Sequence, residues 1–221
     1  MFNLLSPLKT QIEFFEKHGQ SIIYKKGHYI VSADNPSPWV YMLKEGHALS
    51  YSTFSDGTDR ILSFIPPGMP FAQLGSFFNI DSSGLEYRSV DKSIVLRIPN
   101  ELFLKQLSID KSFQADYMQS LLRNQMHLVD RILYQGEKDI YARTIRWIIF
   151  MNKYYGVQNN DNSWMIGVPL TQEIAGNFMY ITRESVNASF RKLNKKKLIY
   201  SHKKHIIIPK MDALKDELAK Q

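Results

Sequence analysis

The chain has 221 residues, of which 44 % are hydrophobic and 22 % charged, as in an ordinary globular protein. It contains no cysteine, which excludes disulfides, thiol catalysis and cysteine-ligated zinc or iron–sulfur centres. The sequence has no apolar run of about 18 residues, the length that predicts a membrane span. The first residues lack a signal-peptide pattern, so we expect a cytoplasmic protein that does not enter a membrane.

The net charge of +7 comes from the C-terminal part of the chain. Residues 1–138 carry 14 basic and 14 acidic side chains, whereas residues 139–221 carry 14 basic and 7 acidic ones. Eight of the basic side chains lie between Arg183 and Lys204, where Glu184 is the only acid. Such a concentration of positive charge is typical of a polyanion-binding surface. A solvated charge run is the alternative, because isolated basic clusters are common on protein surfaces.

Residues 21–98 predict an antiparallel β-roll or barrel. Short apolar and β-branched runs alternate with turn signals such as Glu45-Gly46 and Asp56-Gly57, where glycine accepts a positive φ. No helical pattern lies between the runs, which favours antiparallel pairing. The main predicted strands are Ser21–Tyr24, His28–Val31, Trp39–Leu43, Ala48–Phe54, Arg60–Ile65 and Ser93–Ile98.

From Pro99 onward the hydrophobic period becomes that of helices. Glu101–Leu107 predicts a short helix, and the segment from Lys111 to about Tyr134 predicts a long one. Residues spaced three and four apart on the long helix form the seam of a two-stranded coiled coil. They are Met118, Leu121, Gln125, Leu128 and Ile132. We expect a homodimer through this stripe; packing of the stripe on the chain's own β-domain is the alternative.

The polar run Gln135-Gly136-Glu137-Lys138 interrupts the helical pattern and predicts a hinge. A further helix is predicted from Asp139 to about Tyr155, and a strand from Trp164 to Val168. We therefore expect a sensor domain at residues 1–110, a dimerisation helix with its hinge at 111–137, and a DNA-binding domain at 138–221.

The segment from Leu170 to Leu193 has the pattern of a helix–turn–helix. In its second helix Val186, Phe190 and Leu193 share one face, and polar side chains occupy the opposite face. Arginine, asparagine and glutamate on such a face suit the major groove, since they can pair with guanine, adenine and cytosine. Thr182 can cap this helix, and a helix N-terminus favours phosphate. The residues expected to contact DNA here are Thr171, Thr182, Arg183, Glu184, Ser185, Asn187 and Arg191.

A basic β-hairpin, or wing, is predicted after the helix–turn–helix. Two β runs, Leu198–Ser201 and His205–Ile208, flank a basic tip. We expect the lysines of this region to contact phosphate, which adds affinity without sequence information. They are Lys195, Lys196, Lys197, Lys203 and Lys204. His202 and His205 have ligand-like spacing, but no clustered carboxylate joins them, so we expect no metal site.

In this order, the motifs resemble those of the Crp/Fnr family of bacterial regulators over about residues 20–215. The matching segments are Tyr41–Gly46, Asp56-Gly57, Leu62, Pro67-Gly68, Phe71, Leu170–Ala175 and Thr182–Val186. The resemblance implies an α+β fold with a cyclic-nucleotide-binding-like β-roll (jelly roll), a long dimerisation helix and a C-terminal winged helix-turn-helix. It also implies a homodimer on a pseudo-palindromic site in double-stranded DNA near promoters, with RNA polymerase as a further candidate partner.

The sensor part departs from the family members that bind cyclic nucleotides. In them Phe-Gly-Glu and a following Arg hold the ligand, whereas this chain has Phe71-Ala72-Gln73 and no cation near Ser83. Aligning the next strand places Arg88 beyond the phosphate position; a shift of strand register that returns Arg88 to the pocket is the alternative. Because a buried phosphate without a cation is costly, we expect no control by cyclic AMP. The candidate pocket for an unknown small-molecule effector comprises Phe71, Gln73, Leu74, Ser83 and Arg88.

Ile174 and Val186 are one residue further apart than in most of the family. This feature and the divergent roll resemble the PrfA-like branch of Firmicute regulators. Ala188 stands where many members have a second groove-reading arginine, so we expect an unusual half-site.

The sequence has no catalytic motif, so we expect neither an enzyme nor a cofactor. The alternative function is a ligand-binding module whose basic domain docks an acidic protein or RNA.

Overall fold

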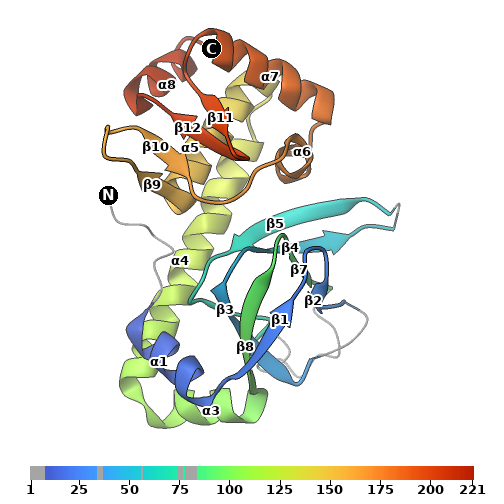
Figure 1. Ribbon diagram of the computed structural model, residues 1–221, viewed down its shortest axis with the longest axis vertical. Helices are drawn as coiled ribbons and strands as arrows, with labels where there is room; N and C mark the ends of the chain where they lie inside the picture. Colours follow the sequence, from blue (N-terminus) through green and yellow to red (C-terminus); the bar gives the residue numbers. More distant parts are fainter. Residues whose placement is uncertain (1–7, 34–36, 56, 74–76, 78–83) are drawn as a thin grey trace. The chain divides into compact units, whose positions relative to one another are not determined.

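The computed structural model describes residues 8–33, 37–55, 57–73, 77 and 84–221. The chain forms two compact units, which meet in sequence between Arg123 and Asn124 (Figure 1). This boundary lies inside the long helix α4 (Lys111–Gln135), not at the hinge expected around Gly136. The reason is packing, because the second half of α4 joins the C-terminal unit by bonding to helix α5 (Ile140–Tyr155). Asp130 accepts hydrogen bonds from Lys153 and Tyr154, both at 2.5 Å.

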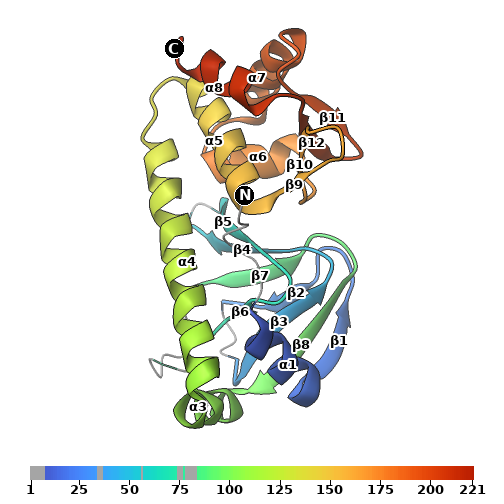
Figure 2. The same ribbon diagram turned by 90° about the vertical axis from the view of Figure 1, so that its left-hand side faces the viewer.

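The N-terminal unit is a β-roll of two antiparallel four-stranded sheets (Figure 2). The first sheet has the order β1 (Gln20–Tyr24), β8 (Ser93–Pro99), β3 (Trp39–Glu45), β6 (Pro70–Phe71). The second has the order β2 (Tyr29–Val31), β7 (Glu86–Ser89), β4 (Ala48–Thr53), β5 (Asp59–Ile65). Every predicted strand is present. Strands β6 and β7 were not predicted, because β6 has two residues and β7 is mostly polar.

Besides the first half of α4, the described residues of this unit include the helices α1 (Lys9–His18) and α3 (Asn100–Ile109). Helix α3 is the predicted short helix, whereas α1 was not predicted. Helix α1 packs on the first half of α4, where the ring centroids of Phe14 and Phe113 are 5.0 Å apart. Thr10 also donates to the Asp116 carboxylate at 2.7 Å. The N-terminal half of α4 is therefore anchored to the roll by a segment far from it in sequence.

The C-terminal unit combines α5 with a helix–turn–helix and a four-stranded sheet. Its other helices are α6 (Gln172–Met179), α7 (Arg183–Lys195) and α8 (Met211–Leu218). The sheet has the order β11 (Tyr200–His202), β12 (His205–Ile208), β10 (Trp164–Ile166), β9 (Gly156–Gln158). Trp147, Phe178 and Leu193 are fully buried and join α5, α6 and α7 into one core. None of the helices in the described ranges has the length and hydrophobicity needed to cross a bilayer.

Candidate nucleic-acid interface

Helix α7 has one buried and one exposed face, as predicted. Val186, Phe190 and Leu193 are buried against the core of the unit. Arg183, Glu184 and Arg191 are exposed on the other side. A helix that is supported from one side and carries charged side chains on the other can enter a groove of DNA without exposing its core.

Hydroxyl caps fix the N-termini of both helices of the motif. Thr171 accepts a hydrogen bond from the backbone N–H of Ile174, and Thr182 accepts one from that of Ser185. The caps are at 3.1 and 3.2 Å, respectively, and each satisfies a backbone donor that would otherwise lack a partner within the helix. The N-terminus of α7 is thus held in a defined position, where its dipole favours a phosphate.

Asn187 makes a contact that the sequence did not indicate. Gln172 of α6 donates to the Asn187 side-chain oxygen at 3.3 Å. This bond orients the Asn187 amide and leaves its nitrogen to donate to another group. Gln172 therefore joins the set of residues that shape the exposed face of the motif.

The hairpin of β11 and β12 carries Lys203 and Lys204 at its two-residue tip. Both lysines have positive φ, 46° and 69°, a conformation that usually selects asparagine or glycine. The Lys204 carbonyl accepts a hydrogen bond from the Leu170 N–H at 2.7 Å, next to the α6 cap. Two cations are therefore held beside the N-terminus of α6 at a conformational cost.

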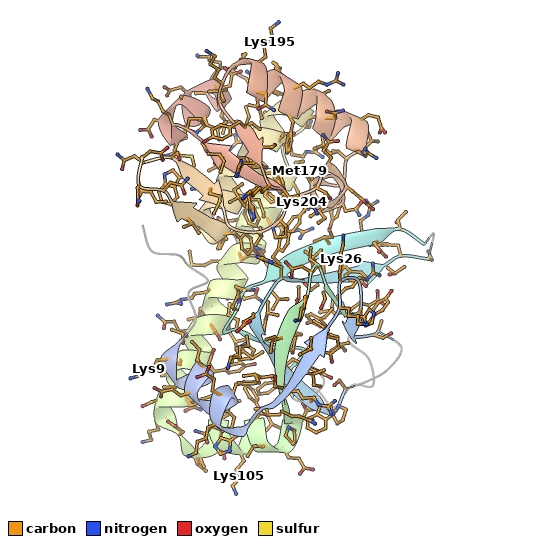
Figure 3. All side chains as sticks on the ribbon, in the orientation of Figure 1. Lys9, Lys26, Lys105, Met179, Lys195 and Lys204 are labelled. Atoms are coloured by element: carbon orange, nitrogen blue, oxygen red, sulfur yellow. The ribbon has the colours of Figure 1, made fainter. Side chains whose placement is uncertain are left out.

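The other lysines of the basic segment lie elsewhere and depart from the expectation of one phosphate-binding cluster. Figure 3 shows Lys195 and Lys204 at opposite ends of the C-terminal unit. Lys196 forms a 2.5 Å ion pair with Glu217, a carboxylate only 5 % exposed, so its charge stabilises α8. Lys197 has a φ of 56° just beyond the C-cap of α7, with the Leu198 N–H bonded to the Leu193 carbonyl. Sequence adjacency grouped these lysines, but strand β11 lies between them and the hairpin tip.

Lys192 is a basic residue of α7 that the sequence analysis did not single out. Its ammonium lies 3.6 Å from the centroid of the Tyr141 ring. Together with Ser185 and Asp139 it lines a concave pocket of about 340 Å³ between α5 and α7. Of the residues that line this pocket, Lys192 is the only one with a cationic side chain, and Asp139 is the only one with a carboxylate. The signal for it was weak, because a lysine in a basic run is indistinguishable from its solvated neighbours.

The predicted coiled-coil stripe of α4 is exposed. Met118, Leu121, Leu128 and Ile132 have exposed fractions from 38 % to 68 %. The apolar face is broader than predicted, because a second row lies beside the first. It comprises Leu122, Met126, Val129 and Leu133. Exposed apolar area of this extent on one helix is typical of a protein–protein interface.

Phe71 packs among aromatic and aliphatic side chains in the core of the roll. Phe71 lies between Tyr41 and Tyr87, at ring-centroid distances of 5.6 and 5.0 Å. Gln73 donates to the Tyr117 hydroxyl, while burial raises the pKa of Tyr117 to about 12. Two more of the five predicted pocket residues, Leu74 and Ser83, lie outside the described residues.

Arg88 does not join Phe71 in the interior, which is a departure from the predicted pocket. Its neighbour Tyr87 packs in the core, so the alternation of a strand directs Arg88 to the opposite side of β7. There its guanidinium donates to the Tyr29 hydroxyl at 2.7 Å and lies 4.4 Å from the Tyr51 ring centroid. Asp59 completes the surroundings with an ion pair at 3.6 Å.

Two family models match the chain. The cyclic nucleotide-binding domain matches residues 22–110, and the Crp-like helix-turn-helix domain matches residues 142–217. The chain is a Crp/Fnr-type transcription regulator. The predicted fold, a cyclic-nucleotide-binding-like roll followed by a DNA-binding helix-turn-helix, is confirmed.

Individual relatives agree with this assignment. The Crp/Fnr-type chain is 28 % identical over 193 residues to the transcriptional activatory protein AadR of Rhodopseudomonas palustris, covering 85 % of this chain and 76 % of AadR. Its fold resembles FixK2 of Bradyrhizobium japonicum, with a TM-score of 0.75 and 21 % identity over 90 % of this chain and 96 % of FixK2. A CooA variant of Carboxydothermus hydrogenoformans has a TM-score of 0.76 and 14 % identity, with 93 % and 90 % covered.

Proposed function

We propose that this regulator binds a pseudo-palindromic DNA site as a homodimer and places α7 in the major groove of each half-site. The observation that carries the proposal is the exposed face of α7 from Arg183 to Arg191, beside a hairpin whose tip consists of two lysines.

The contacts divide into two kinds. Arg183, Glu184 and Arg191 would read base edges, because they are exposed and project from a rigid helix. Asn187 would join them through its free amide nitrogen. Phosphate would be bound by Lys203 and Lys204, which lie beside the α6 N-terminus. The remaining residues predicted on the helix–turn–helix, Thr171, Thr182 and Ser185, lie at helix N-termini and would contribute to phosphate binding there.

The partner in the homodimer would be a second copy of α4. The exposed apolar rows from Met118 to Leu133 match the stripe that a parallel two-stranded coiled coil requires. A two-fold axis along this stripe would place two α7 helices on successive turns of DNA, which is why a pseudo-palindrome is expected.

Control by cyclic AMP is not part of the proposal. The aromatic cluster around Phe71 occupies the roll, and Arg88 is engaged with Tyr29 and Asp59 on the other side of β7. Arg88 is therefore not placed to neutralise a phosphate buried beside Phe71. The effector, if the protein has one, would be of different chemistry.

The likeness to AadR, which is described as a transcriptional activatory protein, favours activation of transcription with RNA polymerase as the partner. In-vitro transcription from a promoter that carries the selected site tests the sign. Increased transcript supports activation, and reduced transcript identifies a repressor.

Enrichment from a random DNA library tests the DNA-binding proposal directly. We expect a two-fold symmetric motif and, in sedimentation, a dimer at micromolar protein. Retention of all sequences alike, or preference for RNA or an acidic protein, would contradict the proposal. The PrfA-like assignment predicts in addition that the enriched half-site differs from the one common in the family.

A further inference from the structure

Three side chains of α4 converge on one carbonyl at the end of α6. The Phe178 carbonyl accepts from Arg131 at 3.5 Å, from Tyr134 at 3.3 Å and from Gln135 at 3.4 Å. Phe178 belongs to the last turn of α6, whose carbonyls have no partner within the helix. Helix α4 thus caps the C-terminal end of α6 from outside, over a separation of more than 40 residues in sequence.

Arg131 also holds the residue that follows α6. It donates to the Tyr180 hydroxyl at 2.9 Å, and its guanidinium lies 4.8 Å from the Phe178 ring centroid and 5.4 Å from that of Tyr180. Tyr180 has φ 58° and ψ 43°, the left-handed conformation, and it makes the turn from α6 into α7. A tyrosine in this conformation is strained, and the surrounding contacts must hold it in place.

The burial and charge of Arg131 fit this role. Arg131 is only 4 % exposed, which is rare for an arginine and costly unless its donors are used. A cation at the C-terminus of α6 is favoured by the helix dipole. Gly176, one turn earlier, leaves no room for a side chain, because a Cβ there would lie 2.8 Å from the Ile181 carbonyl. The turn is therefore closely packed on the α6 side and bonded on the α4 side.

We propose that Arg131 is a positioning residue for DNA recognition. Through Phe178 and Tyr180 it fixes the angle of α7 relative to α4, the helix that carries the dimer face. In a dimer this angle sets the distance between the two α7 helices, and so the half-site spacing that the protein accepts. The inference rests on the proposed function, since it assigns a source of specificity to that site.

Three variants and a matched control test the proposal. Arg131→Met keeps the length of the side chain and removes its donors, and Arg131→Lys retains the charge with one donor group. Tyr180→Phe removes only the hydroxyl and leaves the buried cation in place. Lys138→Met, at an exposed position in the same unit, removes one cation without touching the turn. Affinity for the selected operator, for operators with one base pair added or removed between half-sites, and for random DNA is measured for each variant.

We expect Arg131→Met to lower the ratio of specific to random-DNA affinity by at least about 10-fold, the effect of losing an aligned base contact. Affinity for operators with altered spacing should fall less than affinity for the selected operator, so that the spacing preference weakens. Affinity for random DNA should change no more than in Lys138→Met. Tyr180→Phe should change the ratio in the same direction, and Arg131→Lys should restore part of it. The inference would be overturned if Arg131→Met and Tyr180→Phe both had the same ratio of specific to random-DNA affinity as Lys138→Met.

Hydrogen exchange of the free protein separates this inference from the proposed function. The Ile181 N–H bonds to the Gly176 carbonyl across the turn at 3.1 Å and reports its opening. We expect this amide to exchange at least about 10-fold faster in Tyr180→Phe, while amides of the α5 core are unchanged. If the wild-type protein selects no DNA sequence, the proposed function fails, yet the exchange result still decides whether the turn is held by α4. Should Arg131→Met not fold, Tyr180→Phe alone decides.

Discussion

Arg183 is exposed at the first position of α7, and its role is separable from that of a phosphate-binding lysine. We expect Arg183→Ala to weaken binding to the selected operator by about 1–3 kcal/mol and to relax preference at one base pair per half-site. Lys204→Ala, at the hairpin tip, should weaken all DNA alike and lower the salt slope by about 1. Binding titrations across salt concentrations check both. Equal losses on every sequence in both variants would contradict the recognition-helix assignment.

The notable feature of Lys197 is its backbone conformation and not its charge. Its φ of 56° at the end of α7 is a position where glycine is preferred, because the side chain strains a left-handed residue. We therefore expect Lys197→Gly to raise the free energy of unfolding by about 0.5–1 kcal/mol, measured by urea denaturation. The salt slope of DNA binding should stay unchanged. A slope reduced as in Lys204→Ala would instead place Lys197 on a phosphate.

A buried histidine of α4, His127, packs against helix α5. His127 lies among Phe150, Tyr154 and Tyr155, and its Nε2 is 3.1 Å from the Tyr155 hydroxyl. Burial, and secondly the nearby Arg131 cation, lower the pKa of His127 from 6.5 to about 3. The neutral ring is therefore the form that the folded state accepts.

The sign of the resulting pH dependence follows from the lowered pKa. Between pH 6.5 and about 3 the unfolded chain binds a proton at His127 that the folded chain does not. Stability should fall with decreasing pH in this window, by up to about 1.4 kcal/mol per pH unit from this group. Urea titrations from pH 7 to 4 on the wild type and His127→Gln check it. A slope that is as steep in His127→Gln would assign the effect to the carboxylates instead.

The exposed face of α4 predicts the assembly. Replacing Leu121 and Leu128 with lysine places charges in the centre of the predicted seam, so the double variant should sediment as a monomer and lose tight operator binding. Circular dichroism should show that the fold persists, since both side chains are already exposed. A control lysine at Gln119, an exposed position of α4 outside the seam, should leave the dimer intact. A wild-type monomer at micromolar concentration would contradict the prediction.

We expect that cyclic nucleotides do not act on the roll. A ligand can shift a protein between two states only by its differential affinity for them. Because Phe71 packs within an aromatic cluster and Arg88 faces away from it, we expect cyclic AMP and cyclic GMP at millimolar concentration to leave the melting temperature and operator affinity unchanged. Calorimetry measures this. Saturable binding that is lost in Arg88→Ala would show that Arg88 reaches the pocket.

Most elements could be predicted because their signals are local. The strand from Trp39, the long helix from Lys111 and the two faces of α7 follow from hydrophobic period, and the turns follow from residues that accept positive φ. The short strands β6 and β7 and helix α1 could not be predicted in this way. Their sequences lack a strong period, and they form because partners distant in the chain complete them.

The sequence by itself determined the order of elements, the focus of charge in the C-terminal region and the residues on each face of α7. Only the tertiary structure decided which charged side chains, in either part of the chain, are engaged by other groups. Lys196 is bonded to Glu217, Arg88 lies between Tyr29 and Tyr51, and Arg131 holds the turn at Tyr180. The physical reason is that periodicity depends on neighbours three or four residues away, whereas the state of a charge depends on whichever groups folding brings within hydrogen-bonding distance.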